Sequence, residues 1–154
     1  MQAGDLMRGQ RTRKLANTVW LSAIVVALCG IAAPPLPLPE GAVPFLPPTA
    51  FQEWWDATER CAGISKDFAG VSWYVVPGRQ SIPTVAGDKV GLWFGSTSES
   101  AIVLAGDWMH SELVVRHEIL HHLLKNEAHP STYFKDRCQV TWDTYWAVRS
   151  REAR

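Results

Sequence analysis

The chain has 154 residues, and its 15 basic and 15 acidic side chains give a formal net charge of zero at pH 7. This length allows one domain and one appendage. The charge is unevenly divided, because residues 1–33 carry four basic side chains and one acidic one, which leaves −3 on the remainder. Since the chain has no basic stripe, we expect no nucleic-acid partner.

The N-terminal segment, residues 1–33, has the pattern of an export signal. Its four basic residues precede a nearly continuous apolar run over residues 19–33. This run fits the apolar region of a signal peptide better than a full transmembrane helix, which needs about 20 apolar residues. The basic flank would keep the N-terminus in the cytoplasm and direct the remainder across the membrane.

Cleavage of this segment decides whether the protein stays anchored in the membrane or is released from it. Gly30 and Ala32 are small residues at a suitable spacing for cleavage, whereas the two prolines that follow disfavour it. Lipidation of Cys29 is less favoured, because a large leucine precedes it. We therefore expect an exported protein: membrane-anchored through residues 1–33 with its C-terminal domain outside, or secreted or periplasmic after cleavage.

Residues 34–48 form a proline-rich segment that contains seven of the ten prolines. Such a composition favours extended polyproline geometry and is typical of a stiff spacer. The sequence therefore predicts a linker over residues 34–48 and a folded domain over residues 49–154.

The domain alternates between helical and strand patterns. Apolar residues at helical spacing predict helices, and β-branched and aromatic runs that end in turn residues predict strands. The predicted elements are a helix over 49–61, strands over 71–76, 90–94 and 101–105, a helix that begins after Ser111, and a helix over 140–149. We expect a small α+β fold: an N-terminal helix, a sheet of about three strands packed on the helix after Ser111, and a C-terminal helix.

Two cysteines, Cys61 and Cys138, belong to the part that would be exported. In an oxidising compartment an even number of cysteines indicates a disulfide, and no Cys-x-x-Cys spacing supports a metal site instead. A bridge between Cys61 and Cys138 would close a long loop and stabilise the fold by about 4 kcal/mol.

The residues His117-Glu118-Ile119-Leu120-His121 stand inside the predicted helix after Ser111. Residues four apart lie on the same face of a helix, so the two imidazoles point to one place. Two neutral histidines and a neighbouring carboxylate suit a zinc ion with a general base. The surrounding apolar residues at helical spacing are Val114, Val115, Leu123 and Leu124.

This motif, on a helix preceded by strands, resembles the zincin superfamily of zinc-dependent metallopeptidases. The resemblance implies that His117 and His121 bind Zn²⁺ and that Glu118 activates a metal-bound water for attack on a peptide bond. It implies a hydrolase that acts on a peptide or protein substrate. It does not decide the branch of the superfamily.

The third zinc ligand follows less directly. The metzincin pattern would put a glycine at position 124 and a histidine at position 127, where this chain has Leu124 and Glu127. In the branch with a glutamate ligand the third ligand comes from a later helix, where Asp143 and Glu152 are candidates.

His129 is the preferred candidate. Pro130 disfavours a helical conformation at His129, and Asn126 tolerates the left-handed conformation of a helix C-terminus. A chain reversal at Asn126 would bring His129 back toward the motif. Glu127 and the later acidic residues remain the alternatives.

Other residues have weaker assignments. Tyr133 could donate a hydrogen bond to a developing oxyanion, as a tyrosine does in some zincins. His122 lies about 100° round the helix from His121 and is not expected to bind the metal. The tryptophans of the domain fit a core better than a sugar-binding surface.

Two functions remain open. The first is an exported zinc metallopeptidase. An amidase that acts on cell-wall peptides would have much the same sequence features. The second is a noncatalytic, aromatic-rich binding domain in which zinc is structural or absent. A structural zinc would need four protein ligands and would not need Glu118.

Overall fold

The computed structural model describes residues 36–96 and 99–152, so the expected signal or anchor over residues 1–33 lies outside the described part. No helix within the described ranges is long and apolar enough to cross a membrane. The elements are β1 (Val43–Pro44), α1 (Thr49–Ala62), β2 (Ser72–Val76), β3 (Gly91–Gly95), β4 (Ser100–Ala105), α2 (Glu112–Leu124), the π-helical turn η3 (Thr132–Arg137) and α3 (Trp142–Glu152).

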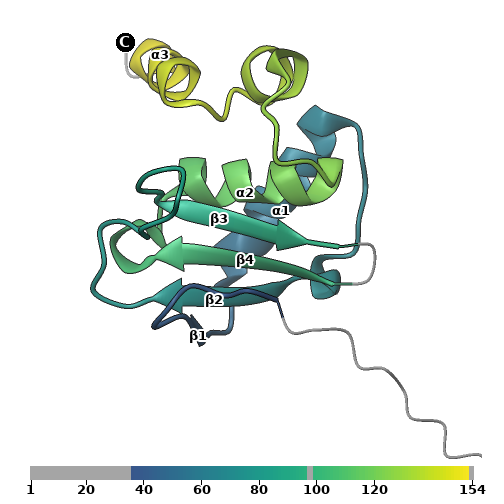
Figure 1. Cartoon of the computed structure of the whole chain (residues 1–154). Helices are drawn as coiled ribbons and strands as arrows, with labels where there is room; N and C mark the ends of the chain where they lie inside the picture. The colour runs from purple at the N-terminus through teal and green to yellow at the C-terminus, as the bar shows by residue number, and fades with distance from the viewer. Residues whose placement is uncertain (1–35, 97–98, 153–154) are drawn as a thin grey trace, which may run out of the picture. The chain divides into compact units, whose positions relative to one another are not determined.

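The fold is α+β, which confirms the expected class, and the four strands form one mixed sheet in the order β1-β2-β4-β3. Strands β2 and β4 are parallel, and the two edge strands β1 and β3 run antiparallel to their neighbours. Helix α2 lies along the β3 side of the sheet, and α3 lies apart from the sheet (Figure 1). The three predicted strands are present, and β1 is an addition to them.

Strand β1 comes from the segment that was expected to be a spacer. Val43–Pro44 pairs with β2, and the backbone N–H of Phe45 donates to the carbonyl of Trp73 at 3.1 Å. Proline is tolerated on an edge strand, because its missing N–H can face away from the neighbouring strand. Residues 43–45, at the end of the 34–48 segment, are therefore hydrogen-bonded to the sheet.

The sheet separates two apolar clusters, because alternate residues of each strand face opposite sides. Trp73 of β2 and Ile102 of β4 face α1 and α2, whereas Val76 and Val103 face the other side. Strand β4 is buried along its whole length. Helices α1 and α2 are thereby fixed against one face of the sheet.

Helix α2 begins at the predicted cap, where the hydroxyl of Ser111 accepts from the N–H of Val114 at 3.5 Å. Arg116 joins α2 to α1, because its guanidinium contacts Glu112 at 3.0 Å and its Nε donates to the hydroxyl of Thr58 at 3.2 Å. Most of α2 is buried, including several polar side chains. Buried polar groups need partners, and those partners define the candidate site.

Cys61 and Cys138 form a disulfide with sulfur atoms 2.00 Å apart. The bond joins α1 to the residue that follows η3. It therefore holds the chain that follows the His-Glu-x-x-His motif against α1.

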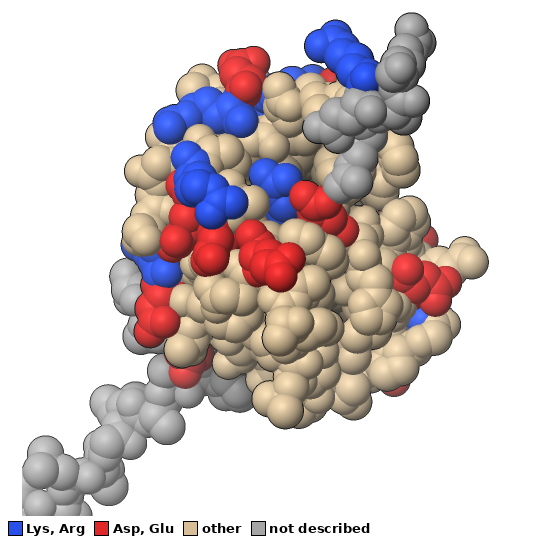
Figure 2. All heavy atoms as spheres, turned by 180° about the vertical axis from the view of Figure 1, so that it is seen from behind, with Lys and Arg blue, Asp and Glu red and all other residues tan. Residues whose placement is uncertain are grey.

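Figure 2 shows one face of the molecule, on which acidic and basic side chains lie interspersed. A broad part of the same face carries neither kind of charge. This face therefore carries charges of both signs rather than a patch of one sign.

Candidate metal centre

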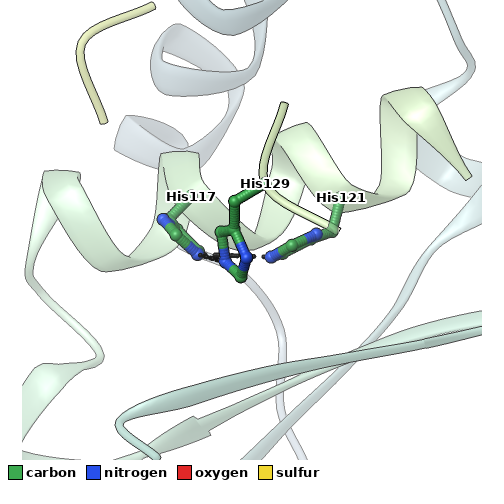
Figure 3. Close-up of side chains that lie close together, drawn as sticks. All are labelled: His117, His121 and His129. Carbon is green, nitrogen blue, oxygen red and sulfur yellow. Dashed lines mark hydrogen bonds between the residues drawn. The ribbon is translucent and has the colours of Figure 1, made fainter. Parts of the chain in front are cut away.

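Three histidines from two parts of the chain meet beside α2. His117 and His121 project from α2, and His129 comes from the segment that follows the helix (Figure 3). One ring nitrogen from each lies within 4.8 Å of the other two. The Nε2 atom of His117 is 2.9 Å from that of His129 and 3.2 Å from that of His121.

Backbone carbonyls set the tautomer of the two helical histidines. The Nδ1 of His117 lies 2.9 Å from the carbonyl oxygen of Val140, and the Nδ1 of His121 lies 2.7 Å from that of Asn126. A carbonyl oxygen only accepts hydrogen bonds, so each Nδ1 must carry the proton and donate it. Each Nε2 then holds a lone pair, and these lone pairs point at one another.

Facing lone pairs repel unless a cation or a hydrogen-bond donor lies between them. Three imidazole nitrogens are a donor set that zinc prefers, and Zn–N distances of about 2.0–2.1 Å in a tetrahedron imply nitrogens roughly 3.3 Å apart. The observed separations of 2.9 and 3.2 Å are close to that spacing. The three histidines could therefore hold a metal ion, and two of their three separations suit zinc.

Burial favours the neutral form of the three histidines, which is the form that binds a metal. Burial lowers the pKa of His117 to about 4, with the carbonyl of Val140 acting in the opposite direction. Burial likewise lowers the pKa of His121 to about 4, and that of His129 is also lowered. Protons would therefore compete weakly for the three ring nitrogens near neutral pH.

Glu118 is buried beneath strand β3, with 5% of its surface exposed. Burial raises the pKa of its carboxyl to about 8, and Lys89 acts in the opposite direction. A dication at the histidines would favour the ionised form, because a nearby positive charge lowers the pKa of a carboxyl. Glu118 is not among the three grouped ligands.

A cleft of about 840 Å³ opens onto these residues. Strand β3 and the loop before it form one wall, and α2 and the start of α3 border the remainder. Its walls are mainly apolar, with lining residues that include Val85, Val90, Phe94, Leu113, Val114, Val140 and Trp142.

Two of the alternative third ligands, Glu127 and Asp143, do not belong to the histidine group. Glu127 lines the cleft but is not part of the histidine group. Asp143 is exposed and bonds to Lys135 at 3.2 Å, and the hydroxyl of Thr141 donates to it at 2.5 Å. The side chain of Glu152 lies outside what the structure describes.

Two other predicted residues occupy different surroundings. Tyr133 does not line the cleft, and the guanidinium of Arg137 lies 5.4 Å from the centre of its ring. His122 is buried on another side of α2, where its Nδ1 lies 2.6 Å from the hydroxyl of Ser100. The structure thus places His122 away from the other three histidines.

The reversal after α2 differs in detail from its prediction. Lys125, with φ of 51°, takes the left-handed conformation that was expected at Asn126. Asn126 instead uses its side-chain oxygen to accept from the N–H of Ala128 at 2.8 Å, and its carbonyl to orient His121. This turn directs His129 back over the helix.

The sequence did not indicate the residues that support the three histidines and Glu118. Asn126 and Val140 act through their backbone carbonyls, and every residue has such a carbonyl, so the residue type does not mark this role. Gly91 could have been noticed, because a glycine inside a predicted strand often marks a close approach. A Cβ atom at Gly91 would lie 2.7 Å from Oε1 of Glu118.

The chain is thus an α+β domain with a three-histidine centre in an open cleft. It matches no protein-family model, and no curated protein or solved structure is significantly similar to it. Fold and site geometry are therefore the grounds for a functional assignment.

Proposed function

We propose that the chain is an exported zinc-dependent peptidase of the zincin kind, which hydrolyses a peptide or protein substrate. The observation that carries the proposal is the convergence of ring nitrogens from three histidines in a cleft, beside the buried carboxyl group of Glu118. Three protein ligands leave one position for water or substrate, as catalytic zinc sites require, whereas structural sites use four.

Each residue would have a defined task. Zinc, when bound at the three histidines, lowers the pKa of a coordinated water toward 7 and polarises a carbonyl as a Lewis acid. Glu118 would accept the proton of the attacking water and pass it to the leaving amine. Val140 and Asn126 would keep His117 and His121 in the binding tautomer through their carbonyls.

The shape of the cleft supports a peptide substrate. Strand β3 is an edge of the sheet, and the run Gly91–Phe94 lines the cleft. An edge strand can pair with an extended peptide through its backbone, while apolar walls accept side chains. A bound peptide would therefore run along β3 and past the three histidines.

Metal analysis combined with one substitution tests the proposal. We expect about one zinc per chain in protein purified without chelator. Glu118→Gln should retain the zinc and lose hydrolysis of a casein or peptide-library substrate by a factor of about 100 or more. Zinc retained with hydrolysis unaffected would remove Glu118 as the base.

The competing function, a noncatalytic binding domain, predicts a different result. Such a domain would show no hydrolysis in the wild-type protein, and zinc would be absent or bound without an open position. Absence of zinc in the wild-type protein would overturn the peptidase.

Export through residues 1–33 belongs to the same proposal. Mass spectrometry of the mature protein separates its two forms: an N-terminus near Ala33 indicates cleavage, and an intact N-terminus in the membrane fraction indicates an anchor. An intact chain in the cytosolic fraction would contradict export.

A further inference from the structure

Phe134 lies against the histidine group. Its side chain is fully buried. The centre of its ring lies 4.9 Å from the imidazole centres of both His117 and His121, and 4.8 Å from that of His129. One apolar ring therefore contacts all three candidate ligands at nearly equal distances.

The backbone of Phe134 is fixed on both sides of this contact. Its N–H donates to the carbonyl of Pro130 at 3.1 Å, and Pro130 is the residue that follows His129. Its own carbonyl accepts from the N–H of Val140 at 2.9 Å, and Val140 is the residue whose carbonyl orients His117. Phe134 thereby links the third ligand to the backbone that holds the first ligand.

We propose that Phe134 is a positioning residue of the metal centre, which holds the three imidazoles in their converging arrangement before the metal binds. The proposal rests on the zinc site of the proposed function. An imidazole without a packing neighbour can rotate about its side-chain bonds. Metal binding would then have to restrict that rotation, which costs conformational entropy and weakens affinity. A rigid ring packed against all three imidazoles limits that rotation once the protein has folded. The entropy that metal binding itself must cost is therefore smaller.

Zinc affinity and metal geometry measure this role independently of catalysis. In the full chain, Phe134→Leu should weaken zinc binding by about 10-fold or more, as loss of an outer partner of a metal site commonly does. In protein loaded with Co²⁺, the visible absorption bands should shift or lose intensity, because the three rings no longer hold one arrangement. Phe134→Met removes the ring at a similar volume with a more adaptable side chain, so it should show the same changes and serves where the leucine variant does not fold.

Phe51→Leu is the matched control. Phe51 is also fully buried, but it lies in α1, and the rings that it contacts are Phe45, Trp54 and Trp73. Its substitution removes the same atoms from the core and should lower thermal stability without changing zinc affinity or the Co²⁺ spectrum.

The outcomes separate this inference from the proposed function. Wild-type protein that binds zinc, together with Phe134 variants that match Phe51→Leu in zinc affinity and Co²⁺ spectrum, would overturn the positioning role alone. Wild-type protein that binds no zinc would overturn both. Weakened zinc binding confined to the Phe134 variants would establish the role.

Discussion

Glu118 occupies the space that a side chain at Gly91 would fill. A Cβ atom at Gly91 would lie 2.7 Å from Oε1, 2.8 Å from Cγ and 3.0 Å from Cδ of Glu118. Gly91 belongs to the edge strand β3, and Glu118 belongs to α2. The absence of a side chain on the strand thus makes room for the proposed base.

This relationship predicts the effect of a single methyl group. Gly91→Ala should displace the carboxylate of Glu118 and lower kcat/KM for peptide hydrolysis by about 100-fold, as a misplacement of about 1 Å can. Zinc content should stay at the wild-type level, because neither residue is among the three histidines. Kinetics and metal analysis on the same preparation check both parts.

Gly70→Ala is the control for this variant. A Cβ at Gly70 would meet nothing within 4 Å, so activity should stay at the wild-type level. Equal activity of the two alanine variants would show that hydrolysis does not depend on the observed position of Glu118.

The choice of third ligand can be tested through stability. Zinc that binds only the folded protein should raise the free energy of unfolding by about 4 kcal/mol at a free concentration of about 1,000 times Kd. His129→Ala should lose most of this gain, because the Nε2 of His129 lies 2.9 Å from that of His117. Thermal unfolding with zinc and with chelator measures the difference.

Glu127→Ala is the matched comparison, since Glu127 lines the same cleft without joining the histidine group. It should keep the full stabilisation by zinc. The reverse pattern, with His129→Ala unaffected and Glu127→Ala impaired, would move the third ligand to Glu127.

The disulfide should contribute to both fold and site. Cys61 and Cys138 are 77 residues apart in sequence, and opening a loop of this size should cost about 4 kcal/mol in the free energy of unfolding. Cys138 also lies between His129 and Val140, so the double variant Cys61→Ser/Cys138→Ser should bind zinc more weakly. Urea unfolding and zinc titration provide the two measurements.

Reduction of the wild-type protein should reproduce the effect of the double serine variant. A reducing agent that leaves both unfolding and zinc affinity unchanged would argue against any role for this bond at the site.

Trp142 should act on substrate rather than on the metal. It lines the cleft, is 46% exposed and packs edge-on against Trp108 at 5.3 Å. Trp142→Ala should lower kcat/KM for peptides with an apolar side chain by about 10-fold, with zinc affinity unchanged.

Trp146→Ala is the control on the same helix. Trp146 is 57% exposed and does not line the cleft, so its loss should leave kinetics unchanged. Equal effects of the two substitutions would place the substrate away from Trp142.

Much of the fold follows from local patterns. The strands over 71–76, 90–94 and 101–105 and the capped helix after Ser111 were predicted to within a residue or two of their observed bounds. Strand β1 was missed, because a proline-rich segment is extended with or without a neighbouring strand. The last helix begins at Trp142 rather than at 140, because Val140 is buried at the site and Thr141 precedes the helix as a hydrogen-bonding partner of Thr144.

The sequence by itself determined that His117, Glu118 and His121 share one helix, because helical spacing is set by bonded geometry over a few residues. It also determined which cysteines were available to pair. Only the tertiary structure decided that His129 joins the group, that Val140 and Asn126 fix the tautomers, and that Gly91 gives Glu118 its room. These relationships depend on where the chain turns after α2 and how it packs on β3, and non-bonded contacts between distant segments leave little trace in local spacing.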